Sequence, residues 1–302
     1  MVDVTIASDA VECVVNTTGG AIWRLDARFD DGTKVPLLRP PPAGEHRDVL
    51  KSGCFPLIPF GNRVAGNCFS FADTEHHLEP NISWDPHYLH GDGWLGEWKL
   101  LLHATESVEL GFEFDGAPYR YAARQLFSAT GRQLEISMTV ENRAQQPLPF
   151  GMGWHPFFPL TPATTLHATA SRYWTERAGW LPDTLVDIPD DLDFSTPGRP
   201  PRRWVNNGFE GWHGDAKIAW PEGDLSLSIS THPPLRRYFL FLSDTKFDPS
   251  YAGDFFCFEP MSHSPNGHNL ANLGGLSILA PGESRSTMMR LTWRHVRGDR
   301  QP

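Results

Sequence analysis

The 302-residue sequence has few cysteines. The four that it has, Cys13, Cys54, Cys68 and Cys257, are widely scattered, and no two of them form a C-x-x-C pair. This distribution argues against a disulfide scaffold, and no cysteine stands at zinc-finger spacing from a histidine. We therefore expect the cysteines to be small buried hydrophobic residues.

Runs of lysine and arginine are also missing. The sequence has 26 Lys and Arg residues against 36 Asp and Glu residues, which gives a formal net charge of −10. Proteins that bind nucleic acid or anionic membranes through broad electrostatic contacts present a basic surface. We therefore expect neither nucleic acid nor a membrane to be a partner.

Long apolar runs are absent as well, since no stretch approaches the ~18 residues of a membrane-spanning helix. Asp3 and Asp9 stand where a secretory signal peptide would have a basic start and a continuous apolar segment. From these absences we expect a soluble, cytoplasmic protein.

Segments with the 3.6-residue apolar spacing of a helix are scarce, whereas short strand-like runs between turn residues recur throughout the chain. Val108, Leu110, Phe112 and Phe114, for example, alternate with polar residues or glycine, as in a strand with one solvent-facing side. The runs that we expect to be strands are 11–15, 21–25, 98–102, 108–114, 119–128, 133–141, 218–220, 225–229, 238–242, 255–258 and 287–293. They predict an all-β fold, a large antiparallel β-sandwich with strongly twisted sheets.

The longest irregular stretch runs from about Pro182 to Asn207. Predicted hairpins before and after it look alike, so we expect ordered loops over one face of the sheets rather than a linker. On this interpretation the chain forms a single domain over residues 1–302.

Four segments rich in glycine, proline and aromatic residues each contain an ionisable side chain, and such loops commonly carry sites. They are residues 59–66, 85–94, 151–158 and 256–263. Residues 91–96 match G-x-G-x-x-G, but a β-hairpin is expected after them, not the helix that a dinucleotide site needs. No G-x-S-x-G motif supports acyl transfer.

The 13 histidines raise the alternative of a metal site. Histidines and acids that lie close in sequence are His87 and His90, Glu75 with His76 and His77, and His263 and His268 near Glu259. However, no H-E-x-x-H motif occurs, and the side chains of His76 and His77 would point to opposite faces of a strand. We expect no metal, and a structural or surface role for His76, His77 and His103.

Two ionisable residues have strongly apolar neighbours. His155 lies between Trp154 and Phe157, and Glu259 directly follows the run 255–258. Desolvation lowers the pKa of an imidazole and raises that of a carboxyl group. Together the two residues suggest general acid and base catalysis on a neutral polar substrate, which requires that they converge on opposite sides of one pocket. For each residue alone, a structural role is the alternative.

Other residues of these segments have the chemistry of a sugar site. Trp94, Trp154 and Trp212 could offer flat apolar surfaces to a sugar ring, with core packing as the alternative. The side chains that could bond to hydroxyl groups are Arg63, Asn62, Asp92 and His90.

In this order, the segments resemble the aldose 1-epimerase (galactose mutarotase) family. The resemblance covers nearly the whole chain and is carried by PLIPFGNRVAGNCFSF, NISWDPHYLHGDGWLGEW, FGMGWHPFFPL, FCFEPMSH and LAPGESRSTMMRLTW. It implies the large antiparallel sandwich of that family, the galactose mutarotase-like supersandwich. It also implies interconversion of the α and β anomers of a free hexose or related aldose, with no cofactor.

The resemblance implies roles for four residues. Glu259 would be the general base that takes the proton of the C1 hydroxyl, and His155 the general acid that protonates the ring oxygen. His90 would hydrogen-bond near the ring oxygen and C1, and Arg63 would hold a hydroxyl group.

One position departs from the family pattern. Asn206 stands where an aspartate often binds sugar hydroxyls, and an amide can donate as well as accept. Arg202 and Arg203 just upstream could favour a phosphorylated, sulfonated or carboxylated sugar. The alternatives are therefore a mutarotase for an anionic sugar, a non-catalytic carbohydrate-binding protein of the same fold and a metal-dependent sugar isomerase.

Overall fold

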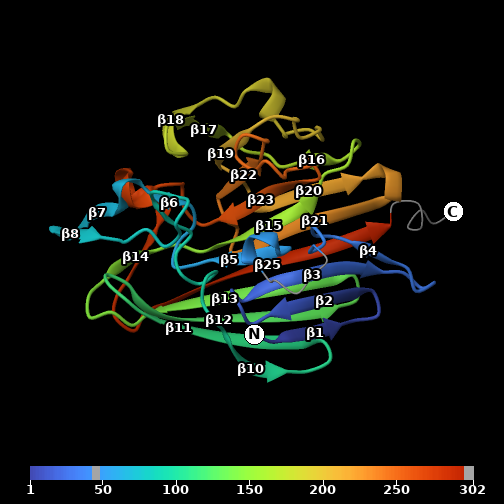
Figure 1. Ribbon diagram of the computed structural model, residues 1–302, viewed down its shortest axis with the longest axis horizontal. Helices are drawn as coiled ribbons and strands as arrows, with labels where there is room; N and C mark the ends of the chain where they lie inside the picture. The colour runs from blue at the N-terminus through green and yellow to red at the C-terminus, as the bar shows by residue number, and fades with distance from the viewer. Residues whose placement is uncertain (43–47, 296–302) are drawn as a thin grey trace.

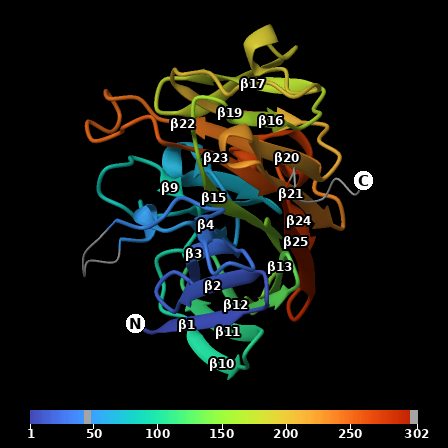
Figure 2. The ribbon, with the colours of Figure 1, turned by 90° about the vertical axis from the view of Figure 1, so that its right-hand side faces the viewer.

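The computed structural model describes residues 1–42 and 48–295 (Figure 1). Within them, two large antiparallel sheets pack on each other as a β-sandwich, which confirms the predicted fold class. Figure 2 shows β1 and β11 together at one end of the sandwich and β16 and β17 together at the other.

The larger sheet has eleven strands in the described part of the chain. Their spatial order is β1 (Asp3–Ala7), β2 (Val11–Asn16), β3 (Ala21–Arg28), β5 (Cys54–Leu57), β15 (Gly153–Pro159), β23 (Phe255–Met261), β22 (Arg237–Leu242), β19 (Val205–Glu210), β17 (Arg172–Arg177) and β18 (Leu181–Val186), with β4 (Lys34–Pro36) paired to β3.

The second sheet has eight strands. Their order is β10 (Lys99–His103), β11 (Ser107–Asp115), β12 (Arg120–Thr130), β13 (Gln133–Asn142), β25 (Ser284–His295), β21 (Leu225–His232), β20 (Asp215–Trp220) and β16 (Thr165–His167).

Three strand pairs and six short 3₁₀ helices complete the described structure. The pairs are β14 (Leu148–Phe150) with β24 (Ser277–Leu279), β6 (Arg63–Val64) with β9 (Tyr88–Leu89), and β7 (Cys68–Phe71) with β8 (Thr74–His77). The helices are η1 (Val49–Lys51), η2 (Ala65–Asn67), η3 (Asp190–Leu192), η4 (Pro221–Gly223), η5 (Gly267–Asn269) and η6 (Ala271–Gly275). No helix in residues 1–42 and 48–295 has the length and apolar character needed to cross a bilayer.

The core lies between the two sheets. On β13, Leu134, Ile136, Met138 and Val140 are buried and alternate with half-buried residues, and this face contacts β2. Strand alternation thus places every second side chain between the layers.

Every run that we expected to be a strand lies largely within an observed strand, because each is a short strand-like run between turn residues. The stretch from Pro182 to Asn207 differs from the prediction of loops alone. It contains the end of β18, the helix η3 and the start of β19. All four cysteines are free, and three are buried as expected, but Cys68 is partly exposed. The expectation of one domain over residues 1–302 stays a prediction.

Substitution of Phe258 on β23 tests how much the core contributes to the free energy of unfolding. The residue is 0% exposed, and its ring stacks on Tyr238 at 4.5 Å between centroids. We expect Phe258→Ala to lower the free energy of unfolding by about 3–5 kcal/mol, through lost burial and the cavity left behind. The control Leu102→Ala, at a side chain 66% exposed, should change it by less than about 0.5 kcal/mol. Equal effects in urea unfolding would contradict this description of the core.

Candidate active site

His155 and Glu259 lie on neighbouring strands of the larger sheet, β15 and β23. Gly153 pairs with Met261 in antiparallel register, so two residues further along each strand His155 and Glu259 reach the same level of the sheet. The Nε2 atom of His155 lies 3.2 Å from Oε1 of Glu259. Long-range strand pairing therefore brings together two groups that are far apart in the sequence.

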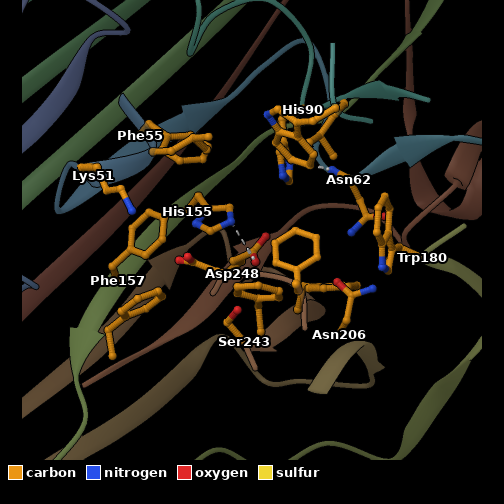
Figure 3. A pocket seen from close by; sticks show the side chains of 18 of the residues that line it. Lys51, Phe55, Asn62, His90, His155, Phe157, Trp180, Asn206, Ser243 and Asp248 are labelled. Atoms are coloured by element: carbon orange, nitrogen blue, oxygen red, sulfur yellow. Dashed lines mark hydrogen bonds and ion pairs between the residues drawn. The ribbon is translucent and has the colours of Figure 1, made fainter. Parts of the chain in front are cut away.

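Both side chains line a cavity of about 550 Å³ (Figure 3). Six residues singled out from the sequence line it: His155, Glu259, His90, Arg63, Asn62 and Asn206. The expectation that the acid and the base lie on opposite sides of the pocket is wrong in one respect. The two groups stand side by side in one wall and contact each other, because their strands are adjacent.

Burial controls the protonation of this pair. The rings of Phe55 and Phe157 lie 4.5 and 4.7 Å from the His155 ring between centroids. Desolvation lowers the pKa of His155 to about 3, and it raises the pKa of Glu259 well above its usual value although Arg63 opposes this. Both shifts disfavour the charged forms. The neutral pair, in which the proton shared by the two side chains is on Glu259, is therefore favoured over the ion pair.

One oxygen of the carboxyl group has no protein partner. Oε2 of Glu259 is buried and forms no hydrogen bond with the described residues. A buried carboxyl oxygen without a partner is tolerated better in the neutral, protonated form than in the charged one.

The imidazole of His90 is held in one tautomer. Its Nδ1 accepts a hydrogen bond from the backbone N–H of Asn62 at 3.0 Å, and its own backbone N–H donates to the Asn62 carbonyl at 2.9 Å. A neutral imidazole whose Nδ1 accepts carries its proton on Nε2. Burial keeps the ring neutral by lowering the pKa of His90 well below its usual value. His90 therefore has an Nε2–H donor for the cavity that it lines.

A second histidine holds the neighbouring amide. Nε2 of His263 accepts a hydrogen bond from the backbone N–H of Gly61 at 3.0 Å, and its Nδ1 lies 3.3 Å from Oγ of Ser262. Two imidazoles thus fix the consecutive N–H groups of Gly61 and Asn62. This contact positions Asn62 and the adjacent Arg63. No sequence pattern indicated this role, and the sequence suggested His263 only as a possible metal ligand.

Arg63 is held from behind by a carboxylate. Its Nε lies 2.8 Å from Oδ2 of Asp85, and its guanidinium carbon lies 5.3 Å from the centroid of the Trp180 ring. The salt bridge is buried and uses Nε, which leaves the Nη groups for the cavity. Asp85 begins one of the four segments singled out from the sequence, but no motif indicated its role or that of Trp180.

The amide of Asn206 is oriented by Glu176. Its Nδ2 donates to Oε1 of Glu176 at 2.9 Å, and the other oxygen of Glu176 accepts from the Trp204 indole at 2.6 Å. Since the amide nitrogen is turned to Glu176, the oxygen is the atom that Asn206 offers to the cavity (Figure 3). Asn206 therefore offers an acceptor to the cavity, and the expectation that its amide also donates stays a prediction.

Four residues expected near the sugar do not line the cavity: Asp92, Trp94, Trp154 and Trp212. The three tryptophans are at most 1% exposed and belong to the core. Trp154 precedes His155 on β15, so strand alternation turns it to the opposite face. Burial raises the pKa of Asp92 to about 6 beside Tyr88.

The aromatic residues that do line the cavity are Phe55, Trp84, Phe157, Trp180, Phe239, Phe241, Phe247 and Phe255.

The two arginines proposed to select an anion also lie outside the lining. Arg202 donates to the carbonyls of Gly253 and Thr161, and Arg203 pairs with Asp191 at 2.5 Å. Their charges are used in loop contacts, so they do not explain a preference for anionic sugars.

The competing motifs also have structural explanations. Residues 91–96 form turns and open no helix, so they lack the geometry of a dinucleotide site. His76 stacks on Phe69, whereas the exposed His77 pairs with Glu75, which confirms that the two histidines face opposite ways. Cys68, Glu75 and His77 lie close enough together to hold a metal ion, but they are on the β7–β8 hairpin, outside the cavity lining.

The profile of the aldose 1-epimerase family matches residues 3–292. The chain therefore belongs to the aldose 1-epimerase family.

Individual proteins are similar over nearly the whole chain. The chain is 45% identical over 292 residues to the uncharacterized protein YphB of Escherichia coli K12, covering 95% of this chain and 97% of that one. A solved structure from the same organism, described as a "putative aldose 1-epimerase", has a TM-score of 0.92 at 43% identity and covers 97% of this chain and 99% of its own. The GalM/aldose epimerase homologue of C. elegans has a TM-score of 0.80 at 16% identity and covers 98% and 99%, and it supports the fold alone.

The buried His263 makes a prediction about acid stability. Burial lowers its pKa from 6.5 to about 4, so between these pH values the unfolded chain binds a proton that the folded chain does not. The contribution of neutral His263 to the free energy of unfolding is therefore fully present above pH 6.5, and it is lost as the pH falls toward 4. In His263→Gln, whose amide can still accept from Gly61, the slope of unfolding free energy against pH should fall by up to ~1.4 kcal/mol per pH unit. Identical slopes in urea unfolding of the two proteins would refute this assignment.

Proposed function

We propose that the protein is a mutarotase, an isomerase that interconverts the α and β anomers of a free hexose or related aldose without a cofactor. The observation that carries the proposal is the contact between His155 Nε2 and Glu259 Oε1 in the wall of the cavity. Membership of the aldose 1-epimerase family supports it.

Ring opening requires that a proton is removed from the C1 hydroxyl and that a proton is supplied to the ring oxygen. Both oxygens are bonded to C1. Transfer of the shared proton from Glu259 to His155 across their contact first forms the carboxylate and the imidazolium. The carboxylate of Glu259 then takes the proton of the C1 hydroxyl, and the C1–ring-oxygen bond breaks as C1 becomes a carbonyl. His155 donates its proton to the departing ring oxygen. The contact between the two side chains matches the closeness of these two oxygens.

Ring closure reverses these steps after rotation about the C1–C2 bond. The protonated carboxyl of Glu259 returns a proton to the carbonyl oxygen, and neutral His155 takes the hydroxyl proton as the oxygen attacks C1 from the other face. The pair therefore returns to its starting state. The neutral pair that burial favours is the form present with the open-chain sugar.

The neighbouring groups hold the sugar during this exchange. The Nε2–H of His90 donates to the ring oxygen or the C1 oxygen, and Arg63 and Asn62 bond to hydroxyl groups. Asn206 accepts from a further hydroxyl through its oxygen. Because each is fixed by a protein partner on its other side, the site is formed before the sugar binds.

A non-catalytic sugar-binding protein of the same fold is a weaker candidate. Binding alone gains nothing from burying an acid and a base against each other, since desolvation of ionisable groups is costly. The retained pair therefore favours an enzyme.

Substitution of the pair tests the proposal. We expect Glu259→Gln and His155→Ala each to slow enzyme-catalysed anomer exchange by about 10²–10⁴-fold, because each removes one proton-transfer group. The measurement is NMR exchange spectroscopy on a panel of free sugars. The controls Glu113→Gln and His103→Ala, outside the cavity lining, should match native protein. Native rates in both cavity variants would contradict the proposal.

The proposal also predicts a bell-shaped dependence of kcat on pH, with activity kept in excess chelator. The form of the pair that carries one proton is active, and it is lost both when a second proton binds and when the last one leaves. Because burial lowers the pKa of His155, the acid limb should lie below the usual histidine value of 6.5. A flat profile would count against paired acid–base catalysis, and loss of activity with chelator would favour the metal-dependent alternative.

A further inference from the structure

The cavity extends past the acid–base pair to a side lined by two cations, Arg39 and Lys51. Figure 3 shows Lys51 and Phe157 on one side of His155, and three other residues on the opposite side: Asn62, Trp180 and Asn206. Arg39 lies near the first side, since its guanidinium carbon is 3.8 Å from the centroid of the Phe157 ring, and it is also 4.4 Å from the centroid of the Phe255 ring on β23.

Arg39 is a buried cation without a carboxylate partner among the described residues. The residue is 9% exposed, and its Nη2 donates to the carbonyls of Leu50 and Ser52 at 2.6 and 2.9 Å. Its Nε and Nη1 form no hydrogen bond within residues 1–42 and 48–295, and they are not among the fully buried atoms. These donors are therefore accessible from the cavity. These unpaired donors are suited to the oxygens of a ligand oxyanion.

Lys51 adds a second cation, and it too forms no ion pair in the described part of the chain. Three carboxylates lie near Arg39, those of Asp254, Asp48 and Asp248, and the last two also line the cavity. Asp48 and Asp248 each already accept a hydrogen bond from a backbone N–H two residues further along the chain. With Lys246, which also lines the cavity, three cations face three carboxylates, so the unpaired donors of Arg39, and not an excess of positive charge, are what favours an oxyanion here.

The order of atoms in a pyranose ring determines which part of the sugar reaches this region. This inference rests on the proposed function, which places the C1 oxygen at Glu259 and the ring oxygen at His155. With the C1 oxygen at Glu259 and the ring oxygen at His155, C2 and C3 lie on the Glu259 side. C5 and its exocyclic carbon C6 lie beyond the ring oxygen, on the His155 side. Arg63 and Asn206 then meet the hydroxyls of C2 and C3, whereas Arg39 and Lys51 meet the substituent at C6.

We propose that Arg39 and Lys51 form a subsite for an oxyanion on C6, so that the preferred substrate is a hexose with a carboxylate, phosphate or sulfonate there. Arg202 and Arg203, which the sequence suggested for this purpose, are engaged in loop contacts.

The test compares anomer exchange of three sugars at constant ionic strength: glucose, glucuronate and glucose 6-phosphate. We expect kcat/KM for at least one anionic sugar to exceed that for glucose about tenfold or more, as charge-assisted hydrogen bonds provide. The preferred anion identifies the oxyanion. Equal or lower values for both anions, and also for glucose sulfonated at C6 when it is measured in the same way, would overturn the subsite.

Substitutions of Lys51 and Arg39 test whether these two residues cause the preference for an anionic sugar. Lys51→Gln should lower the ratio of anionic to neutral kcat/KM about tenfold, mainly through KM, and Arg39→Lys should lower it further because it loses the planar donor pair. Lys34→Gln, at an exposed lysine outside the cavity lining, should leave the ratio unchanged. A ratio that survives both cavity variants would overturn the assignment.

If the proposed mutarotase function is wrong, the same experiments give a result that differs from failure of the subsite. If no sugar exchanges faster with native protein, mutarotation is contradicted, and the subsite is judged by calorimetric binding of glucuronate against glucose. Tighter binding of glucuronate that is lost in Lys51→Gln supports the subsite, and equal binding overturns it.

Discussion

The burial of His155 and Glu259 against each other is the constraint on which the site depends. Either group alone would be costly to place in an aromatic wall, because burial opposes its charged form. Side by side they share one proton, so the wall needs no net charge. The same sharing suits a reaction that removes a proton at one oxygen and supplies one at the next. The pairing register of β15 and β23 thus sets both the stability and the chemistry of the site.

Around this pair, each polar side chain is fixed from the side that faces away from the cavity. Asp85 holds Arg63 and Glu176 holds Asn206, and the backbone of Asn62 fixes the tautomer of His90. Each contact uses one hydrogen-bonding group and leaves another for a ligand. Such second contacts restrict orientation before binding, which lowers the entropic cost of forming the reactive complex.

The sequence predicted the features that depend on local pattern. Alternation in residues 108–114 predicted the strand β11, and apolar flanks singled out His155 and Glu259. It failed where long-range packing decides. Trp94 and Trp154 face the core because of strand alternation and loop packing, and Arg39 and Lys51 reach the cavity from segments with no motif. The orientation of the Asn206 amide depends on Glu176, a partner on another strand.

The central claim is that one carboxyl and one imidazole contact the two oxygens of the same sugar carbon. A crystal structure of the Glu259→Gln variant with a bound aldose tests it most directly, because the variant slows turnover but keeps the shape of the cavity. The account predicts the ring oxygen within about 3.2 Å of His155 Nε2 and the C1 oxygen within the same reach of residue 259. A sugar bound in this cavity with C1 turned away from both residues would contradict it.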